Sequence, residues 1–128
     1  MKHPESAIQR AFIQWCRLNE TRYPALKLAY SIPNGGKRGI ITASILKAEG
    51  ARPGVPDWCL PAATEYATGL WIEFKAGKGK PSPAQAEYIA LLRKYGHQVH
   101  ICDDWEAASK IVVEYVKCHD RKSPKVVI

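Results

Sequence analysis

The spacing of apolar residues changes repeatedly along the chain, and this alternation limits the possible folds more than any other feature. Steps of three and four residues, typical of amphipathic helices, are found in three long segments, 4–18, 83–95 and 105–115. Alternating or short continuous apolar stretches, typical of strands, are found at 26–32, 57–60, 70–75 and 99–102. A shorter helix is predicted at 42–49, closed by Gly50. This order predicts an α/β fold in which helices flank one mixed central β-sheet.

The length and composition of the chain suit one domain. Its 128 residues, 46% of them hydrophobic, can bury a single core. We expect one domain over residues 1–118 and a basic, flexible tail over 119–128. Apolar runs are too short for a membrane span and no signal-peptide layout is present, so a soluble intracellular protein is expected. The cysteines lack metal-ligand spacing and are expected to be reduced: Cys16, Cys59, Cys102 and Cys118.

The charge of the chain favours a polyanionic partner. Nineteen Lys and Arg residues against twelve Asp and Glu give a formal net charge of +7. Binding to nucleic acid releases counterions from the phosphates, which favours association with a basic protein. Because many small basic proteins bind nucleic acid without cutting it, the charge does not distinguish an enzyme from a binding module.

Two acidic residues and a lysine fall where neighbouring strands could bring them together. In segment 70–75 the alternation places Glu73 and Lys75 on the same face. Asp57 opens the preceding predicted strand, and facing side chains on adjacent strands lie about 5 Å apart. One or two carboxylates are enough to bind Mg²⁺, and a bound cation can activate water for phosphodiester hydrolysis. The simpler alternatives are a surface ion pair between Glu73 and Lys75 and a turn role for Asp57 after Pro56.

Two further polar residues are candidates for the same site. Glu5 lies seven residues before Phe12, which predicts that its carboxylate is on the inward face of the first helix. The alternative is that Glu5 only stabilises the dipole of that helix. Gln85 is the third helical position of a capping box that begins at Ser82, and it could serve the helix, the site or both.

Basic residues on predicted loops are candidates for phosphate contacts. They lie in the turn after Asn34-Gly35-Gly36, before Asp57, and in the loop after segment 70–75: Lys37, Arg38, Arg52, Lys78 and Lys80. For each of them, simple solvation on a loop is an equal alternative.

The acidic and basic residues are arranged in a recognisable order. Pro56-Asp57 is followed after fifteen residues by Glu73-Phe74-Lys75, and the turn Arg52-Pro53-Gly54 precedes the aspartate. Gln85 and Tyr88 follow on the next helix. This arrangement, over nearly the whole chain, resembles the PD-(D/E)XK nuclease superfamily and, within it, the VRR-NUC domain of standalone phage and bacterial proteins and of the Fanconi-associated nuclease.

The resemblance implies a restriction-endonuclease-like core and a metal-dependent nuclease site. A divalent metal, Mg²⁺ or Mn²⁺, would be bound by Asp57, Glu73 and the main-chain carbonyl of Phe74. Glu5 would complete the site directly or through water, and Lys75 would lie beside the attacking water. The resemblance also implies a homodimer in the cytoplasm of a bacterial or phage-infected host cell, acting on branched DNA such as four-way junctions.

Three other functions are left open. The chain could be a basic DNA-binding module without catalysis, although carboxylates facing a phosphate channel would weaken binding. It could instead cut flaps or linear duplex. Sequence-specific restriction is less favoured, because reading bases requires an element in the major groove and this small core leaves little chain for one.

Overall fold

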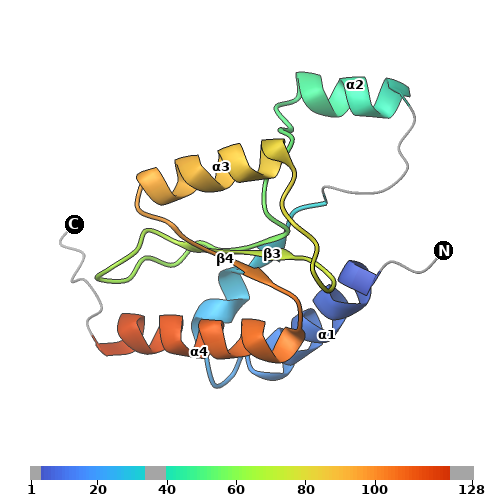
Figure 1. Ribbon diagram of the computed structural model, residues 1–128. Helices are drawn as coiled ribbons and strands as arrows, with labels where there is room; N and C mark the ends of the chain where they lie inside the picture. The colour runs from blue at the N-terminus through green and yellow to red at the C-terminus, as the bar shows by residue number, and fades with distance from the viewer. Residues whose placement is uncertain (1–3, 34–39, 122–128) are drawn as a thin grey trace.

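The computed structural model describes residues 4–33 and 40–121. Within these residues the chain forms a four-stranded β-sheet with α-helices on both faces (Figure 1). The elements are α1 Pro4–Leu18, the 3-10 helix η1 Pro24–Leu28, β1 Tyr30–Ser31, α2 Ile40–Ala48, β2 Trp58–Leu60, β3 Leu70–Phe74, α3 Pro83–Lys94, β4 Gln98–Cys102 and α4 Trp105–Arg121. The predicted α/β fold with a mixed central sheet is confirmed.

The strands follow the order β1-β2-β3-β4 across the sheet. β1 pairs antiparallel with β2, and β2 pairs antiparallel with β3. β3 and β4 are parallel, so α3 carries the chain back between them. Gly96, with a φ of 88°, follows α3 and lets the chain turn into β4, as residues in this left-handed region commonly do after a helix.

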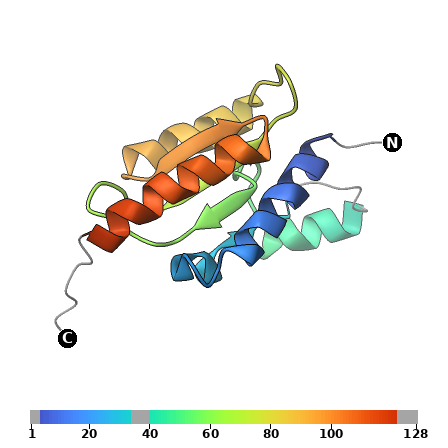
Figure 2. The ribbon, with the colours of Figure 1, turned by 90° about the horizontal axis from the view of Figure 1, so that it is seen from below.

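The sheet separates two layers of helices (Figures 1 and 2). α1 and α4 cover one face, and α3 covers the other. The main core lies on the α1 and α4 side, where Phe12 meets Trp58 edge to face at 4.9 Å and Phe74 at 5.4 Å between ring centroids. Leu70 and Ile72 are also fully buried in this core, as the alternation in β3 predicts.

The segment between α1 and α2 corrects one prediction. Only Tyr30–Ser31 form a strand, whereas Pro24–Leu28 form a turn of 3-10 helix. Pro24 fixes its own φ near the helical value, which favours a helical turn at this point. Leu26 is buried from within this turn, whereas Leu28 and Tyr30 are exposed. The alternating apolar residues of this segment therefore do not form the buried face of a single strand.

The other boundaries lie close to their predicted positions. The Ser82 capping box is present, and the Asp104 carboxylate accepts a hydrogen bond from the Ala107 N–H at the start of α4. α4 continues to Arg121, because Val112, Tyr115 and Val116 extend its buried stripe, so residues 119–121 of the predicted tail are helical. The cysteines are free thiols, as predicted. Among the described helices, none combines the length and the apolar character needed to cross a membrane.

Candidate active site

Asp57 and Glu73 lie opposite each other on neighbouring chain segments. Trp58 of β2 pairs with Ile72 of β3, so one register step further places Asp57 opposite Glu73. The backbone N–H of Phe74 donates to Asp57 Oδ2 at 2.8 Å, and the Asp57 carbonyl accepts from the N–H of Ile32 at 2.8 Å. The predicted meeting of the two acids across adjacent strands is present, and Asp57 is fixed through both its side chain and its backbone.

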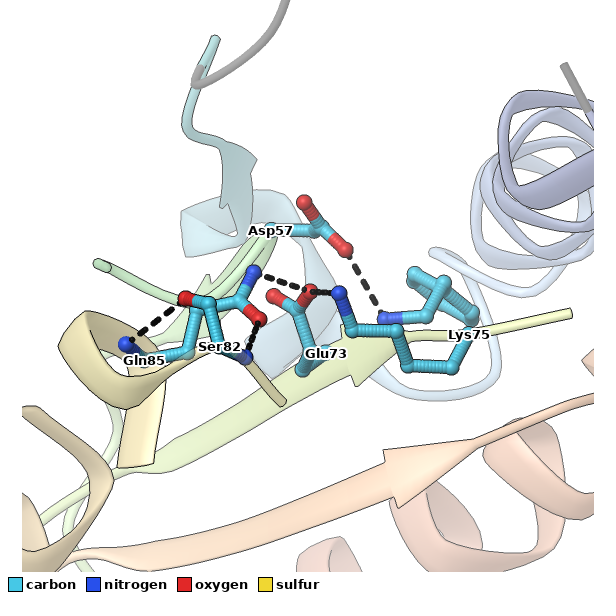
Figure 3. Close-up of polar contacts among 6 residues, drawn as sticks. Asp57, Glu73, Lys75, Ser82 and Gln85 are labelled. Carbon is cyan, nitrogen blue, oxygen red and sulfur yellow. Dashed lines mark hydrogen bonds and ion pairs between the residues drawn. The ribbon is translucent and has the colours of Figure 1, made fainter. Parts of the chain in front are cut away.

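Glu73 is buried, with 2% of its surface exposed. The Lys75 Nζ lies 3.4 Å from Glu73 Oε2, and the Gln85 Nε2 donates to the same oxygen at 2.8 Å. Figure 3 shows the lysine and the glutamine approaching Glu73 from opposite sides, with Asp57 above it. The other carboxylate oxygen, Glu73 Oε1, is buried and has no hydrogen-bond partner in the described structure. A buried acceptor left unpaired costs about 1 to 3 kcal/mol.

Both carboxyl groups of the cluster have raised pKa values, and burial is the main cause for each. Burial raises the pKa of Glu73 to about 7, the nearby charge of Asp57 adds to the effect, and the Lys75 ammonium opposes it. Burial also raises the pKa of Asp57, whereas the Phe74 N–H, the side chain of Glu73 and Lys75 act in the opposite direction. One lysine therefore does not offset the cost of placing two carboxylates together, and the cluster remains deficient in positive charge.

Lys75 is positioned by the sheet. Its backbone N–H donates to the Cys102 carbonyl at 3.0 Å, which continues the pairing of β3 with β4 by one residue. The side chain, 19% exposed, leaves the same face as Glu73, as the alternation predicts. Its ammonium group thus lies between the buried carboxylate and solvent.

Gln85 serves both the helix and the carboxylate cluster. Its Oε1 accepts from the Ser82 N–H at 2.8 Å, which is the capping-box contact. Its Nε2 donates to Glu73, which is the contact with the cluster. The two alternatives left open by the sequence are therefore both present in one side chain.

Gly54 brings the loop before Asp57 against the first turn of α3. Its φ is +83°, and a Cβ at this position would lie 2.4 Å from the Ala84 carbonyl oxygen and 2.9 Å from the Gln85 nitrogen. Any larger residue would have to push the loop and the helix apart. The sequence indicated a turn at Gly54 but gave no sign of this contact, which joins segments thirty residues apart in the chain.

Glu5 is exposed, which corrects the prediction that its carboxylate turns inward. It lies on the same helix face as the fully buried Phe12 but two turns earlier. A rise of 1.5 Å per residue places it about 10 Å further along the axis, where that face is no longer covered. Its negative charge still contributes to the raised pKa of Asp57, so it faces the same region.

The basic candidates are only partly described. Arg52, Lys78 and Lys80 are exposed on the loops that precede Asp57 and follow Lys75. Arg52 also lines an open groove of about 470 Å³ along α3, beside the carboxylate cluster and not including it. Lys37 and Arg38, with the Asn34-Gly35-Gly36 turn, lie outside the described residues.

The structure describes no group of three or more His, Cys, Asp or Glu side chains placed to hold a metal ion. The cluster instead contains two close carboxylates, Asp57 and Glu73, together with the backbone of Phe74.

Comparisons with known proteins agree on one family. The family model of the VRR-NUC domain matches residues 3–106. A solved structure described as a VRR_NUC domain protein superposes with a TM-score of 0.75 at 23% sequence identity, covering 92% of each chain. No curated protein matches the chain significantly in sequence. The solved structure supports the fold, and the family model, which spans most of the chain and both acids, shows that the chain belongs to the VRR-NUC domain family, a family of nucleases.

Proposed function

We propose that the protein is a divalent-metal-dependent endonuclease that hydrolyses phosphodiester bonds in branched DNA, with Asp57, Glu73 and Lys75 as its central residues. The observation that carries this proposal is the convergence of two carboxylates and one ammonium group at the same end of β3. A binding protein gains nothing from two acids on a surface that meets phosphates, because they repel the ligand.

The residues fit a divalent cation. Glu73 Oε1 is buried without a partner in the described structure, and burial raises the pKa of both acids although Lys75 acts in the opposite direction. A hard cation such as Mg²⁺ or Mn²⁺ requires oxygen ligands and is satisfied by one or two carboxylates plus substrate phosphate. Asp57, Glu73 and the Phe74 carbonyl would hold it, and Glu5 would act from the exposed side through water. The bound cation would supply a more acidic water and stabilise negative charge on the phosphoryl oxygens.

The side chains of the cluster then have separate tasks. The Phe74 N–H fixes Asp57 in one orientation, so its second carboxylate oxygen is directed away from the strand. Lys75 places an ammonium group beside Glu73, where it can hold the attacking water and offset charge on the phosphoryl group. Gln85 donates to Glu73 Oε2, which leaves Oε1 as the oxygen available for a further ligand.

The proposed substrate is DNA recognised by its shape. The net charge of +7 and the exposed Arg52, Lys78 and Lys80 support binding to phosphates. Lys37 and Arg38 are further candidates. We infer that the substrates are branched DNAs such as four-way junctions, recognised by the placement of their phosphates and not by the edges of their bases. Two symmetric cuts require two sites, so a homodimer is part of the proposal. A cytoplasmic location, where the DNA of a bacterial or phage-infected cell lies, is also part of it.

Cleavage of labelled junction, flap and linear duplex DNA, with Mg²⁺, Mn²⁺ or chelator, tests the proposal. We expect metal-dependent cleavage that is strongest on the junction and is lost in Glu73→Ala and Lys75→Met. Glu114→Gln and Lys117→Met are matched controls, because they remove an exposed ion pair of 3.6 Å on α4 and should retain full activity. Undiminished cutting by the Glu73 or Lys75 variant would refute the assignment.

The same experiment distinguishes the other functions. Retention of DNA without strand breaks in any metal would indicate a binding module. Preference for flaps or linear duplex would keep the nuclease and change its substrate. Light scattering that gives a monomer at the working concentration would contradict the homodimer.

A further inference from the structure

We propose that Ser82 is a positioning residue of the site, because its hydroxyl holds the first turn of α3 in the geometry in which the Ser82 backbone N–H orients the amide of Gln85, with the NH₂ group and not the oxygen facing Glu73. This inference rests on the proposed function. It concerns how the first turn of α3 and the loop at Gly54 prepare the buried carboxylate for a ligand.

The contacts of Ser82 decide which end of the amide faces the carboxylate. The Ser82 backbone N–H can only donate, and it donates to Gln85 Oε1 at 2.8 Å. The opposite end of the amide, Nε2, is then directed to Glu73 Oε2 at 2.8 Å. A reversed amide would place two donors against each other at Ser82 and two acceptors against each other at Glu73. The capping box therefore excludes the unproductive orientation at both ends (Figure 3).

The oxygen of the Ser82 side chain holds this arrangement in place. Ser82 Oγ accepts from the Gln85 backbone N–H at 3.2 Å, so serine contacts both the backbone and the side chain of Gln85. Pro83 at the first helical position has no N–H to compete for that oxygen and has a fixed φ. The amide is thus anchored before any ligand binds, and little reorganisation is needed when one does.

Gly54 supports the same turn from outside. Its α-carbon lies so close to the Ala84 carbonyl that even a methyl group at this position would collide with backbone atoms. The loop that ends at Asp57 and the turn that carries Gln85 are therefore held at a fixed distance. One contact between the loop and α3 therefore sets the distance between Asp57 and Gln85, the residue that donates to Glu73.

As a result, the two carboxylate oxygens of Glu73 have different surroundings. Lys75 and Gln85 both contact Oε2, whereas Oε1 is left without a partner. If the amide rotated freely, it could reach Oε1 or present its own oxygen to the carboxylate. Ser82 therefore keeps one defined oxygen available.

A capping box also stabilises a helix for purely local reasons, so two complementary variants are needed. Gln85→Glu keeps an acceptor for the Ser82 N–H but cannot donate to Glu73. Ser82→Ala keeps Gln85 but removes the oxygen that holds its backbone. We expect Gln85→Glu to lower kcat by about 10- to 100-fold, as loss of a supporting contact to a metal ligand typically does, and to lower the melting temperature of the metal-free protein, because a second carboxylate then faces Glu73.

Ser82→Ala should lower kcat by about tenfold with little change in KM, and Ser82→Thr should restore it, because threonine retains the hydroxyl. Asp104→Ala is the matched control. Asp104 caps α4 in the same way, through the Ala107 N–H at 2.6 Å, so this variant should lose stability and keep kcat. A Ser82→Ala variant that loses stability but keeps wild-type kcat would overturn the proposal.

A second readout does not depend on cleavage. In ¹H–¹⁵N spectra of the metal-free protein, the side-chain NH₂ of Gln85 should give two well-separated signals that exchange slowly with water. In Ser82→Ala the chemical shifts of these signals should move toward those of an exposed glutamine and their exchange with water should become faster. Ser82→Thr should restore both. If the wild type cuts no DNA, the proposed function fails, whereas an unchanged Gln85 signal in Ser82→Ala shows that the positioning proposal is wrong.

Discussion

The two faces of β3 differ sharply, although their residues alternate along one short strand. Phe74 packs against Phe12 in the aromatic core beneath α1 and α4. Glu73, its neighbour in the chain, is equally buried on the opposite face, where it meets Lys75 and Gln85 and keeps one oxygen without a partner. Burial is the same on both faces, and its energetic effect is opposite.

This difference separates the part of the molecule that stabilises the fold from the part that prepares the site. Burying a large apolar side chain contributes about 1.5 to 3 kcal/mol. Burying a carboxylate beside another carboxylate opposes folding unless a cation compensates the charge. The apolar face should therefore tolerate no truncation, whereas neutralising the polar face should strengthen the fold and end the activity.

The largest effect is expected on the apolar face. Phe12→Ala removes a fully buried ring that meets Trp58 and Phe74, so we expect a loss of about 3 to 5 kcal/mol in the free energy of unfolding. Urea unfolding followed by tryptophan fluorescence measures it. Arg17→Ala, on an exposed position of the same helix, should change stability by less than about 0.5 kcal/mol. A loss below about 1 kcal/mol for Phe12→Ala would contradict the placement of the core.

The opposite sign is expected for Glu73→Gln in the metal-free protein. The pKa of Glu73 is raised to about 7, so folding binds a proton to this group between its ordinary pKa and about 7. Stability therefore falls as the pH rises through this window and levels off above it. At about pH 8 the neutral glutamine should stabilise the fold by about 1 to 3 kcal/mol, and the gain should vanish at about pH 4. Unfolding measured at both pH values checks this. A Glu73→Gln variant that is less stable than the wild type at the higher pH would mean that the Glu73 carboxylate does not oppose folding.

The apolar face was predictable from the sequence to a degree that the polar face was not. The alternation in β3 and the three- and four-residue steps of α1 directly specify which side chains meet the core. The meeting of Asp57 and Glu73 followed from adjacent strands, and the Ser82 box followed from local chemistry. The contact of Gln85 with Glu73 and that of Gly54 with Ala84 depend on where α3 docks, which no local pattern encodes.

The incorrect predictions have the same origin. Glu5 shares a helix face with Phe12, but the period of a helix does not tell where the sheet beneath it ends. In segment 26–32 only Tyr30–Ser31 form the predicted strand, because Pro24 begins a 3-10 helical turn that continues to Leu28. Periodicity identifies which face of a helix or strand is apolar. How far along the element that face is covered depends on where the neighbouring elements pack.

A smaller effect is expected for the pH dependence of cation binding. It compares the polar face of β3 with and without a bound cation. Because protons and the cation compete for Glu73, binding of Mn²⁺ should be about tenfold tighter at about pH 8 than at about pH 6. Titration calorimetry of the wild type measures this ratio. Glu73→Gln should bind weakly and without this pH dependence. Equal affinity at the two pH values in the wild type would mean that the cation does not contact Glu73.

The smallest effect tests whether every polar contact on this face belongs to the site. Trp71 shares the face of Glu73, and its Nε1 donates to His97 Nδ1 at 2.9 Å at the far end of β3. Trp71→Phe removes this hydrogen bond but keeps the ring, so we expect a loss of about 1 kcal/mol in stability and an unchanged kcat. Paired unfolding and cleavage measurements check both. Because Trp71 lies two residues before Glu73 on the same strand, a large fall in kcat without unfolding would mean that the polar face acts as one connected unit. An unchanged kcat would confine the site to the end of the strand, where the carboxylates meet α3.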